Sequence, residues 1–320
     1  MLAPPLLVSY SSLEDYLSAL SPEMREMYEE KIRALVDHQL PPVVSSRCLS
    51  VLFGYSTKFV NALALRNYKY YREFTIRKGN KRRKIQAPRV ALKVIQKWFA
   101  HHLANTLPVE DCVYGFVSGR SAVDAASRHC GASWVYSVDI ENFFPSTEDD
   151  VVVEALKGLG YSEKGARLIT CLCCYGSYLG QGAPSSPVLS NLVMTPIDVQ
   201  LKSVADELGI TLTRYADDIV FSGREDFPEE IRLRVEKIFS GTGWRLSANK
   251  EYLAEAKNGQ RLKVHGLLVN GEVPRLTKGY RNRIRAYKHL IATDKVKPED
   301  RRRIIGHIKF AESVEGWKRK

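Results

Sequence analysis

The sequence has 320 residues, of which 44% are hydrophobic and 26% charged, and this balance excludes a disordered chain. The length allows about two domains or one large interrupted domain. No apolar run is long enough to span a bilayer, and no basic segment precedes the short apolar patch at the start, so we expect neither a membrane protein nor a signal peptide. Six cysteines without regular spacing are typical of reduced thiols, which predicts a cytoplasmic protein.

The formal net charge of +12 is divided unevenly along the chain. Residues 72–97 contain ten Lys and Arg against one Glu, and residues 275–320 contain fifteen against five Asp and Glu. An ordinary solvated surface mixes the two signs. Two basic blocks around an acidic middle therefore predict that a polyanion is bound at both ends of the protein.

The first third of the chain is expected to consist of helices and one hairpin. Residues 12–38 begin with capping patterns at Ser12 and Ser21, which predict helix. The stretch "REFTIRKGNKRRKIQAP" (72–88) predicts two strands around a Gly-Asn turn, so that its basic residues lie on a hairpin. Apolar residues at helical spacing predict a helix over residues 91–107.

The remainder alternates strands with helices. A buried strand is expected to begin at residue 134, and residues 211–223 read as a strand pair centred on Ala216 and Asp217. Residues 261–276 read as a strand pair that turns at Asn270-Gly271 and leads into a basic helical tail. Three further helices are expected, over residues 147–160, 164–176 and 190–209. This order of elements predicts the α+β class.

Three aspartates stand out against their apolar surroundings. Asp217 and Asp218 lie between hydrophobic flanks, and Asp139 directly follows the apolar run 135–138. A shared sheet would bring them side by side, and converging carboxylates repel one another unless a cation intervenes. Oxygen ligands favour Mg²⁺, and two such ions activate a hydroxyl and stabilise a departing pyrophosphate. Taken alone, an Asp-Asp pair is more often a turn or a helix cap, so a structural role stays open.

Three motifs, taken in order, resemble those of reverse transcriptases. "VDIENFFPS" (138–146) is similar to motif A of that family, "QGAPSSPVLSNL" (181–192) to motif B and "YADD" (215–218) to motif C. The resemblance extends over about residues 70–275, because the blocks "KRRKIQAP", "YGFVSGRSAVDAA", "NKEYL" and "KVHGLLV" also match. It implies a right-hand polymerase with fingers, a palm formed by an antiparallel sheet with helices, and a small helical thumb.

The same resemblance implies a division into four parts. Residues 1–65 would form an N-terminal helical extension and residues 66–135 the fingers. Residues 136–274 would form the palm, including the motif B helix, and residues 275–320 a basic thumb.

Site residues are carried over position by position. Asp139, Asp217 and Asp218 match the catalytic carboxylates that bind two Mg²⁺ ions. The matched nucleotide-binding positions are Arg83 and, more weakly, Lys78 for the triphosphate, Phe144 under the sugar, Gln181 and Gly182 in the pocket, and Lys250 near the pyrophosphate. The structural alternatives are core packing for the phenylalanines, an ordinary turn before a helix for motif B and solvated charge for the basic residues.

Among reverse transcriptases, "FFPS", "LCCYG" and "QGAPSSP" most resemble the bacterial retron enzymes. Two retron elements are altered: the Asn-Ala-x-x-His element has Ala125 in place of Asn, and the Val-Thr-Gly triplet has His265 in place of Thr. Because these elements are associated with choosing the cognate RNA, the resemblance suggests RNA contacts at His129 and His265. The basic tail fits a thumb that recognises RNA stems, which suggests further contacts at Arg281, Arg283 and Arg285. His129 as a core histidine and His265 as an edge-strand residue stay open.

A retron enzyme binds a structured noncoding RNA as template and primer. The resemblance implies priming from the 2′-hydroxyl of an internal guanosine, dNTP substrates, and a branched RNA–DNA product called msDNA. It also implies a bacterial cytoplasmic protein that acts in antiphage defence with an effector protein. The alternatives are a group II intron-like or abortive-infection-type enzyme, and a non-catalytic RNA-binding scaffold with a polymerase fold.

Overall fold

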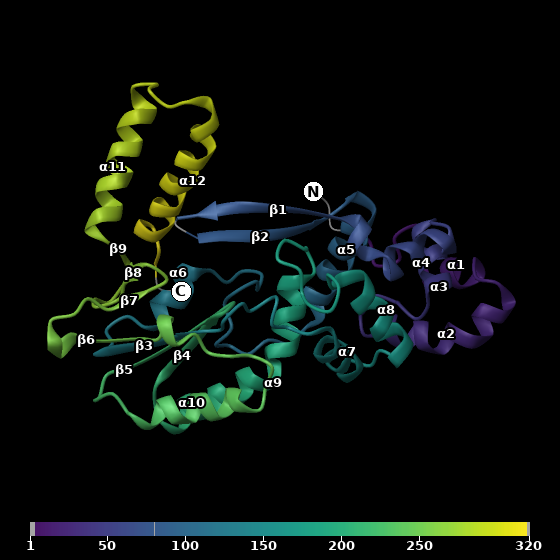
Figure 1. The fold of residues 1–320 in the computed structure, drawn as a ribbon, viewed down its shortest axis with the longest axis horizontal. Coiled ribbons are helices and arrows are strands. Elements are labelled where there is room, and N and C mark those ends of the chain that lie inside the picture. The colour runs from purple at the N-terminus through teal and green to yellow at the C-terminus, as the bar shows by residue number, and fades with distance from the viewer. Residues whose placement is uncertain (1–3, 80, 319–320) are drawn as a thin grey trace. The chain divides into compact units, whose positions relative to one another are not determined.

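The computed structural model describes residues 4–79 and 81–318 (Figure 1). The side chains of Lys78 and Lys81 also lie outside the description, and so does Asn80 of the predicted Gly-Asn turn. The chain forms two compact units. Unit 1 comprises Met1–Val109, Glu141–Pro196 and Thr242–Trp244, and unit 2 comprises Glu110–Ile140, Ile197–Gly241 and Arg245–Lys320. The predicted four-part division stays a prediction.

Unit 1 is mainly helical. Ser12 and Ser21 cap two separate helices, so residues 12–38 are helical as predicted but interrupted between Ser18 and Pro22. The helices of this unit are α1 (Leu13–Ser18), α2 (Pro22–Asp37), α3 (Ser46–Phe53), α4 (Thr57–Leu65), η1 (Asn67–Tyr70), α5 (Val90–Thr106), α7 (Asp149–Gly158) and α8 (Glu163–Cys173). The described helices include no single one that is long and apolar enough to cross a membrane, although the bent pair α3–α4 passes on length and composition.

The predicted basic hairpin of unit 1 is present. Strand β1 (Tyr71–Lys78) pairs antiparallel with β2 (Lys81–Pro88), and Phe74 lies opposite Ile85. Most side chains of both strands are exposed, since the hairpin is covered only near its base. Basic residues therefore stay in water, where their charge costs little.

Unit 2 is organised around a four-stranded antiparallel sheet in the order β4-β5-β3-β6. Its strands are β3 (Trp134–Asp139), β4 (Thr211–Tyr215), β5 (Asp218–Gly223) and β6 (Tyr252–Glu255). The two central strands are buried along nearly their whole length, which explains why the sequence shows apolar runs there instead of alternation. The associated helices are α6 (Ala122–Arg128), α9 (Ser186–Glu207, whose first part belongs to unit 1), α10 (Glu230–Ser240), η2 (Ala248–Lys250) and η3 (Ala256–Asn258).

The predicted strand pair at 261–276 differs from the structure. Three short strands are found, β7 (Lys263–Val264), β8 (Leu267–Leu268) and β9 (Arg275–Leu276). The predicted Asn270-Gly271 lies in the connection between β8 and β9, which pair antiparallel, so the chain does reverse there. A first hairpin that was not predicted turns at His265-Gly266, where φ is +48° and +81°, the positive values that two-residue hairpin turns need. Asn270 also accepts a hydrogen bond from the Leu262 N–H at 3.0 Å.

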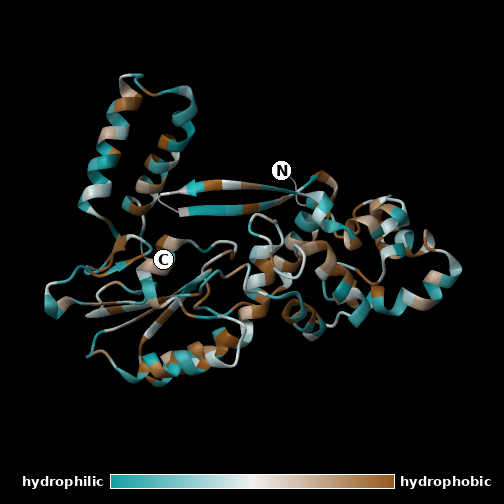
Figure 2. Ribbon diagram, in the orientation of Figure 1, coloured by the Kyte–Doolittle hydropathy of each residue, from teal (hydrophilic) through white to brown (hydrophobic). Residues whose placement is uncertain are grey.

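The basic tail forms two helices, α11 (Lys278–Ala292) and α12 (Pro298–Glu315). Both alternate hydrophilic and hydrophobic residues (Figure 2), and one apolar cluster joins their buried faces to α6 and to the sheets of unit 2. Ile284 of α11 and Val314 of α12 belong to this cluster. The Trp317 indole packs against it and donates a hydrogen bond to Asp124 of α6 at 3.0 Å. The tail is therefore part of the core of unit 2.

Candidate active site

The acidic pair lies at a tight turn of the palm-like sheet. Strand β4 ends at Tyr215 and β5 begins at Asp218, so Ala216 and Asp217 form the turn. Asp139, at the end of β3, lies directly opposite Asp218 in the antiparallel register. The Ile140 N–H also donates to the Asp217 carbonyl at 3.0 Å. The expectation that a shared sheet would bring Asp139 beside the pair is thus met.

Charge at this end of the sheet is only partly neutralised. Burial raises the pKa of the Asp139 carboxyl, and the negative charges of Asp217 and Asp218 act in the same direction, while Lys250 opposes them. Lys250, on η2, forms an ion pair with Asp139. The arrangement therefore concentrates negative charge at this end of the sheet, where the Lys250 ammonium pairs with Asp139.

The donor chemistry and the strand register suit a carboxylate-bound cation. Side-chain orientation is less suitable, since the described residues include no three Asp, Glu, His or Cys side chains that converge closely enough to hold a metal ion. Asp139 is turned toward Lys250, and Asp218 lies 3.1 Å from the His265 Nδ1 atom. Joint metal binding would require these carboxylates to rotate. The metal roles of the three aspartates stay a prediction.

Of the two histidines predicted to contact RNA, both in unit 2, His129 is buried and His265 is partly buried. His129 is 1% exposed, and its ring nitrogens lie 2.7 Å from the hydroxyls of Ser222 and Thr213. Burial lowers the pKa of His129 to about 3, so the ring is neutral. This geometry corrects the predicted RNA contact, because no polar atom of the ring is available, and it fits the alternative of a core histidine.

His265 packs against the residues that flank the turn of motif C, Tyr215 and Asp218. Its side chain is 9% exposed, its Nδ1 atom faces Asp218, and its ring lies 5.2 Å from that of Tyr215, measured between centroids. The buried Nε2 atom has no hydrogen-bond partner among the described residues. Part of the side chain stays exposed at this position next to motif C, and its contact with RNA stays a prediction.

The nucleotide-binding residues predicted in motif B lie beside the basic hairpin of unit 1. The Gln86 N–H donates to the Gln181 carbonyl at 2.8 Å, and the Gln181 N–H donates to the Gln86 side chain at 2.9 Å. Gly182 has a φ of +115°, and a Cβ there would come within 2.7 Å of the Ile85 side chain. Only glycine fits this close approach. Arg83, three residues before Gln86, is exposed on the same strand.

Phe143 and Phe144 differ in burial. Phe143 is 4% exposed and packs against Trp244, with ring centroids 6.5 Å apart, so it belongs to the core of unit 1. Phe144 is half-buried, which leaves part of its ring for another contact. Its role under the incoming sugar stays a prediction.

Comparison with known proteins identifies the family. The reverse transcriptase (RNA-dependent DNA polymerase) family matches residues 76–265. The retron Ec86 reverse transcriptase of Escherichia coli is 30% identical over 252 residues, which cover 77% of this chain and 74% of that protein. The chain belongs to the retron reverse transcriptases. It is accordingly an RNA-directed DNA polymerase with an α+β polymerase fold.

A second retron reverse transcriptase, Mx162 of Myxococcus xanthus, is 31% identical over 231 residues, which cover 63% of this chain but only 47% of that protein. Among solved structures, apo telomerase from Candida tropicalis matches 66% of this chain and 48% of its own with 11% identity and a TM-score of 0.48. The telomerase likeness is too weak to support a conclusion about function.

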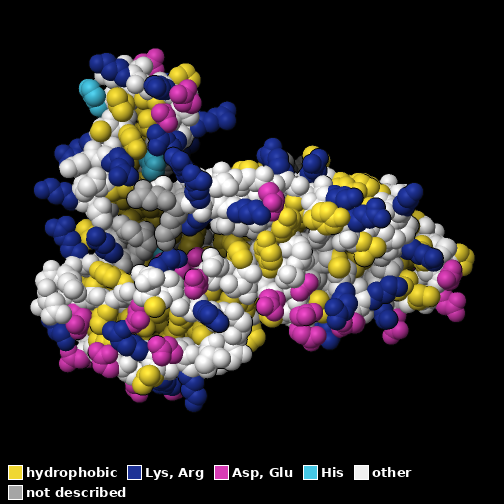
Figure 3. All heavy atoms as spheres, viewed as in Figure 1, with side chains coloured by type: hydrophobic (Ala, Val, Ile, Leu, Met, Phe, Trp, Pro, Cys, Tyr) yellow, Lys and Arg dark blue, Asp and Glu magenta, His cyan; other side chains and the backbone are white. Residues whose placement is uncertain are grey.

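In this reverse transcriptase the predicted thumb arginines are on the surface of α11. Arg281, Arg283 and Arg285 are exposed, and Lys and Arg side chains are numerous over α11 and α12 (Figure 3). Arg281 and Arg285 are four residues apart and share one face of the helix, whereas Arg283 points to another side. This basic surface suits a phosphate backbone, and its binding of RNA stays a prediction.

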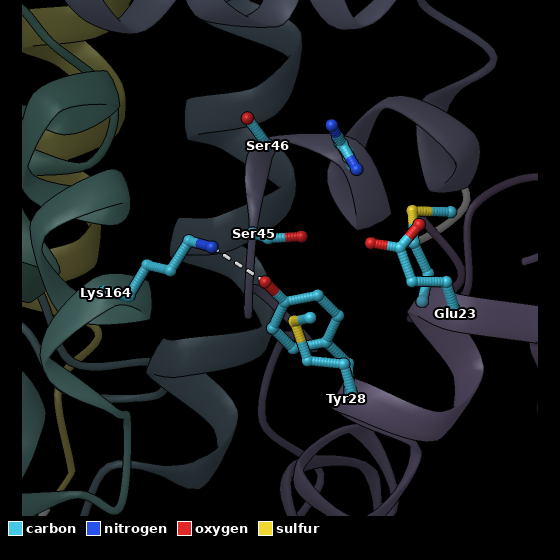
Figure 4. Close-up of a pocket in the computed structure, with 8 residues that line it drawn as sticks. Glu23, Tyr28, Ser45, Ser46 and Lys164 are labelled. Carbon is cyan, nitrogen blue, oxygen red and sulfur yellow. Dashed lines mark hydrogen bonds between the residues drawn. The ribbon is translucent and has the colours of Figure 1, made fainter. Parts of the chain in front are cut away.

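A pocket of about 280 Å³ lies among the helices of unit 1, apart from every predicted site residue (Figure 4). It is lined by Glu23, Met24, Met27, Tyr28, Ser45, Ser46, Arg47 and Lys164. The Lys164 ammonium donates to the Tyr28 hydroxyl at 2.7 Å. The Lys164 ammonium therefore already has a hydrogen-bond partner within the pocket.

Three residues that contact the turn Ala216–Asp217, directly or through one another, could not be predicted from the motifs. These are Arg214, which directly precedes motif C, Asp198 on α9, and Gly115. A signal was present: Arg214 and Asp198 are both charged residues inside apolar stretches of the sequence. Only their pairing, sixteen residues apart on a strand and a helix, was not visible.

Proposed function

We propose that this retron reverse transcriptase binds a cognate structured noncoding RNA and copies part of it into msDNA from an internal guanosine 2′-hydroxyl. The observation that carries the catalytic part is the register that sets Asp139 opposite Asp218, with Asp217 in the adjoining turn. The membership of the retron family supports the choice of RNA template and product. The effector protein, the role in antiphage defence and the bacterial cytoplasm as location are proposed on the same ground.

The three aspartates would hold two Mg²⁺ ions. Such ions lower the pKa of the attacking hydroxyl and stabilise the charge on the departing pyrophosphate. The chain's own part is to fix the backbone of the three aspartates on adjacent strands and in a two-residue turn, so that their carboxylates need only rotate to meet the ions. Lys250, now paired with Asp139, is placed to exchange that partner for the negative charge of a pyrophosphate.

Unit 1 would supply the nucleotide contacts. Arg83 is suited to a triphosphate because a guanidinium makes bidentate contacts with phosphate oxygens. Lys78 is assigned to the same task from sequence alone, because its side chain is outside the described part of the chain. The backbone of Gln181 and Gly182 would approach the nucleotide, and Phe144 would lie under its sugar and exclude a 2′-hydroxyl.

The metal assignment is tested by replacing Asp217 with Asn, which keeps the shape and removes the charge. We expect Mg²⁺-dependent dNTP incorporation on a primed homopolymer RNA template to fall by about a thousandfold or more, as for loss of an essential catalytic group. RNA binding by the purified protein should be retained. Wild-type incorporation by this variant would contradict the assignment.

The RNA-binding surface of α11 is tested by the triple variant Arg281→Gln, Arg283→Gln, Arg285→Gln. Removing the whole tail is less informative, because α11 and α12 contribute to the core of unit 2. A triple Gln variant of Arg301, Arg302 and Arg303 on α12 removes equal charge and is the control. We expect the α11 variant to lose about tenfold more affinity than the α12 variant for the RNA encoded beside the gene. Binding of unrelated RNA of equal length is measured at the same salt concentration for comparison. Equal losses would show that only net charge matters.

A further inference from the structure

Arg214 is a fully buried cation directly before the catalytic turn. The residue is 0% exposed, and Asp198 of α9, which pairs with it, is 2% exposed. The Nε and Nη2 atoms each donate to one carboxylate oxygen of Asp198 at 2.5 Å. This is the two-bond geometry in which arginine and a carboxylate interact most strongly.

A further hydrogen bond connects this pair to the turn itself. The Arg214 Nη1 atom donates to the Ala216 carbonyl at 3.1 Å. Ala216 has a φ of +59°, a left-handed conformation that costs an alanine free energy. A contact from outside the turn is therefore needed to hold this conformation. The buried Arg214 guanidinium supplies such a contact through its hydrogen bond to the Ala216 carbonyl.

Gly115 packs closely against the backbone of the same turn. A Cβ at Gly115 would come within 2.3 Å of the Ala216 nitrogen and 2.9 Å of the Tyr215 carbonyl carbon. The Tyr114 and Gly115 N–H groups also donate to the Arg214 carbonyl, at 2.8 and 3.3 Å. The backbone of the turn is thus packed directly against the segment that contains Gly115.

The energetics favour a positioning role over a stabilising one. Desolvation of two charges offsets most of their attraction, so a buried ion pair adds little stability compared with apolar residues of the same size. Burial indeed raises the pKa of the Asp198 carboxyl, and Arg214 opposes this shift. What apolar residues could not supply is the directed bond to the Ala216 carbonyl.

We propose that Asp198 and Arg214 are positioning residues of the polymerase: Asp198 orients Arg214, and Arg214 holds the turn that presents Asp217 and Asp218. The proposal rests on the proposed catalytic role of those two aspartates. Without the pair, the turn would relax from its strained conformation while the rest of the sheet stays intact. Small displacements of reacting groups reduce rates strongly, by about a hundredfold for 1 Å.

The test is the double variant Asp198→Leu, Arg214→Met in the full chain. It replaces the pair by apolar side chains of similar size, so we expect it to fold with a thermal midpoint within about 5 °C of the wild type. On a homopolymer RNA template with a DNA primer, we expect kcat to fall by about tenfold or more, with KM for the dNTP within about twofold. The Mg²⁺ concentration for half-maximal rate should rise, which a purely structural role would not produce.

A control variant and a second test variant accompany this experiment. Lys202→Met, Asp206→Leu removes an exposed ion pair of the same helix α9 and should leave all three parameters unchanged. Arg214→Lys keeps a cation for Asp198 but cannot make all three bonds, so it should fold and show the same selective loss of kcat. The proposal would be overturned by a folded double variant that has wild-type kcat and Mg²⁺ dependence. If the double variant does not fold, a folded Arg214→Lys with wild-type kcat and Mg²⁺ dependence would overturn it. Asp217→Asn is measured in parallel: if it too is active, the proposed metal assignment fails instead.

Discussion

The basic hairpin of unit 1 and the motif C turn of unit 2 differ in how far their charged side chains are exposed to water. On β1–β2 the charged side chains are exposed, and the ion pair between Glu73 and Lys84 is on the surface. At the turn, Arg214 is buried with Asp198, and Asp139 is partly buried beside Lys250. Exposed charges can be changed at little cost to folding, whereas buried charges are fixed by their partners. Substitutions in unit 1 should therefore alter substrate binding, and those around the turn should alter the rate.

Among substitutions outside the three aspartates, the largest effect is expected from Gly115→Ala in unit 2. The added methyl group would clash with the backbone of Ala216 and Tyr215, which has no flexible side chain that could give way. We expect kcat on a primed homopolymer template to fall by about a hundredfold or more. Gly158→Ala, at the end of α7 with no atom within 4 Å of its added Cβ, is the control and should retain wild-type activity. An active Gly115→Ala enzyme would show that the turn tolerates displacement.

A smaller and different effect is expected from Arg83→Ala on the hairpin. Since Arg83 is exposed, the thermal midpoint should not change, and KM for the dNTP should rise by about tenfold through loss of a charge-assisted phosphate contact. Lys84→Ala, the next residue on the strand, breaks only the surface pair with Glu73 and should change KM by less than about twofold. Equal effects at both positions would mean that the hairpin acts by net charge alone.

The smallest effect concerns stability and pH, and it belongs to unit 2. Burial lowers the pKa of His129 to about 3, below its usual value near 6.5, so the unfolded state binds the proton more readily. The stability that follows from a neutral His129 is present above pH 6.5 and is lost as the pH falls toward 3. Between pH 7 and pH 5 we expect this residue to reduce the free energy of unfolding by about 2 kcal/mol. Denaturant titrations of wild type and His129→Gln should show a weaker pH dependence for the variant, and parallel curves would contradict the assignment.

Much of this fold was predictable from local patterns. Caps at Ser12 and Ser21, the Gly-Asn signal in the hairpin and the apolar run before Asp139 each specify an element through neighbouring residues alone. The turn at His265-Gly266 was missed because the positive φ of His265 is imposed by the surrounding strands and is not signalled by its residue type. A local pattern cannot show such a constraint.

The candidate site was also predictable in part from the sequence. The motifs identified the aspartates, and pairing in the sheet followed from their strands. The burial of His129 and the pairing of Asp198 with Arg214 depend on which elements pack together, so they required the structure. The same holds for His265, whose contact with Asp218 follows from the short hairpin that contains it.

The most direct test of the proposed reaction is the nucleic acid that co-purifies with the protein from cells containing its neighbouring RNA gene. We predict a DNA strand joined to RNA through a 2′–5′ bond, so that debranching enzyme releases the DNA and ribonuclease alone leaves a short RNA remnant attached. The Asp217→Asn protein should carry the RNA without DNA. Linear DNA without a branch, or the same DNA on the Asp217→Asn protein, would contradict the account.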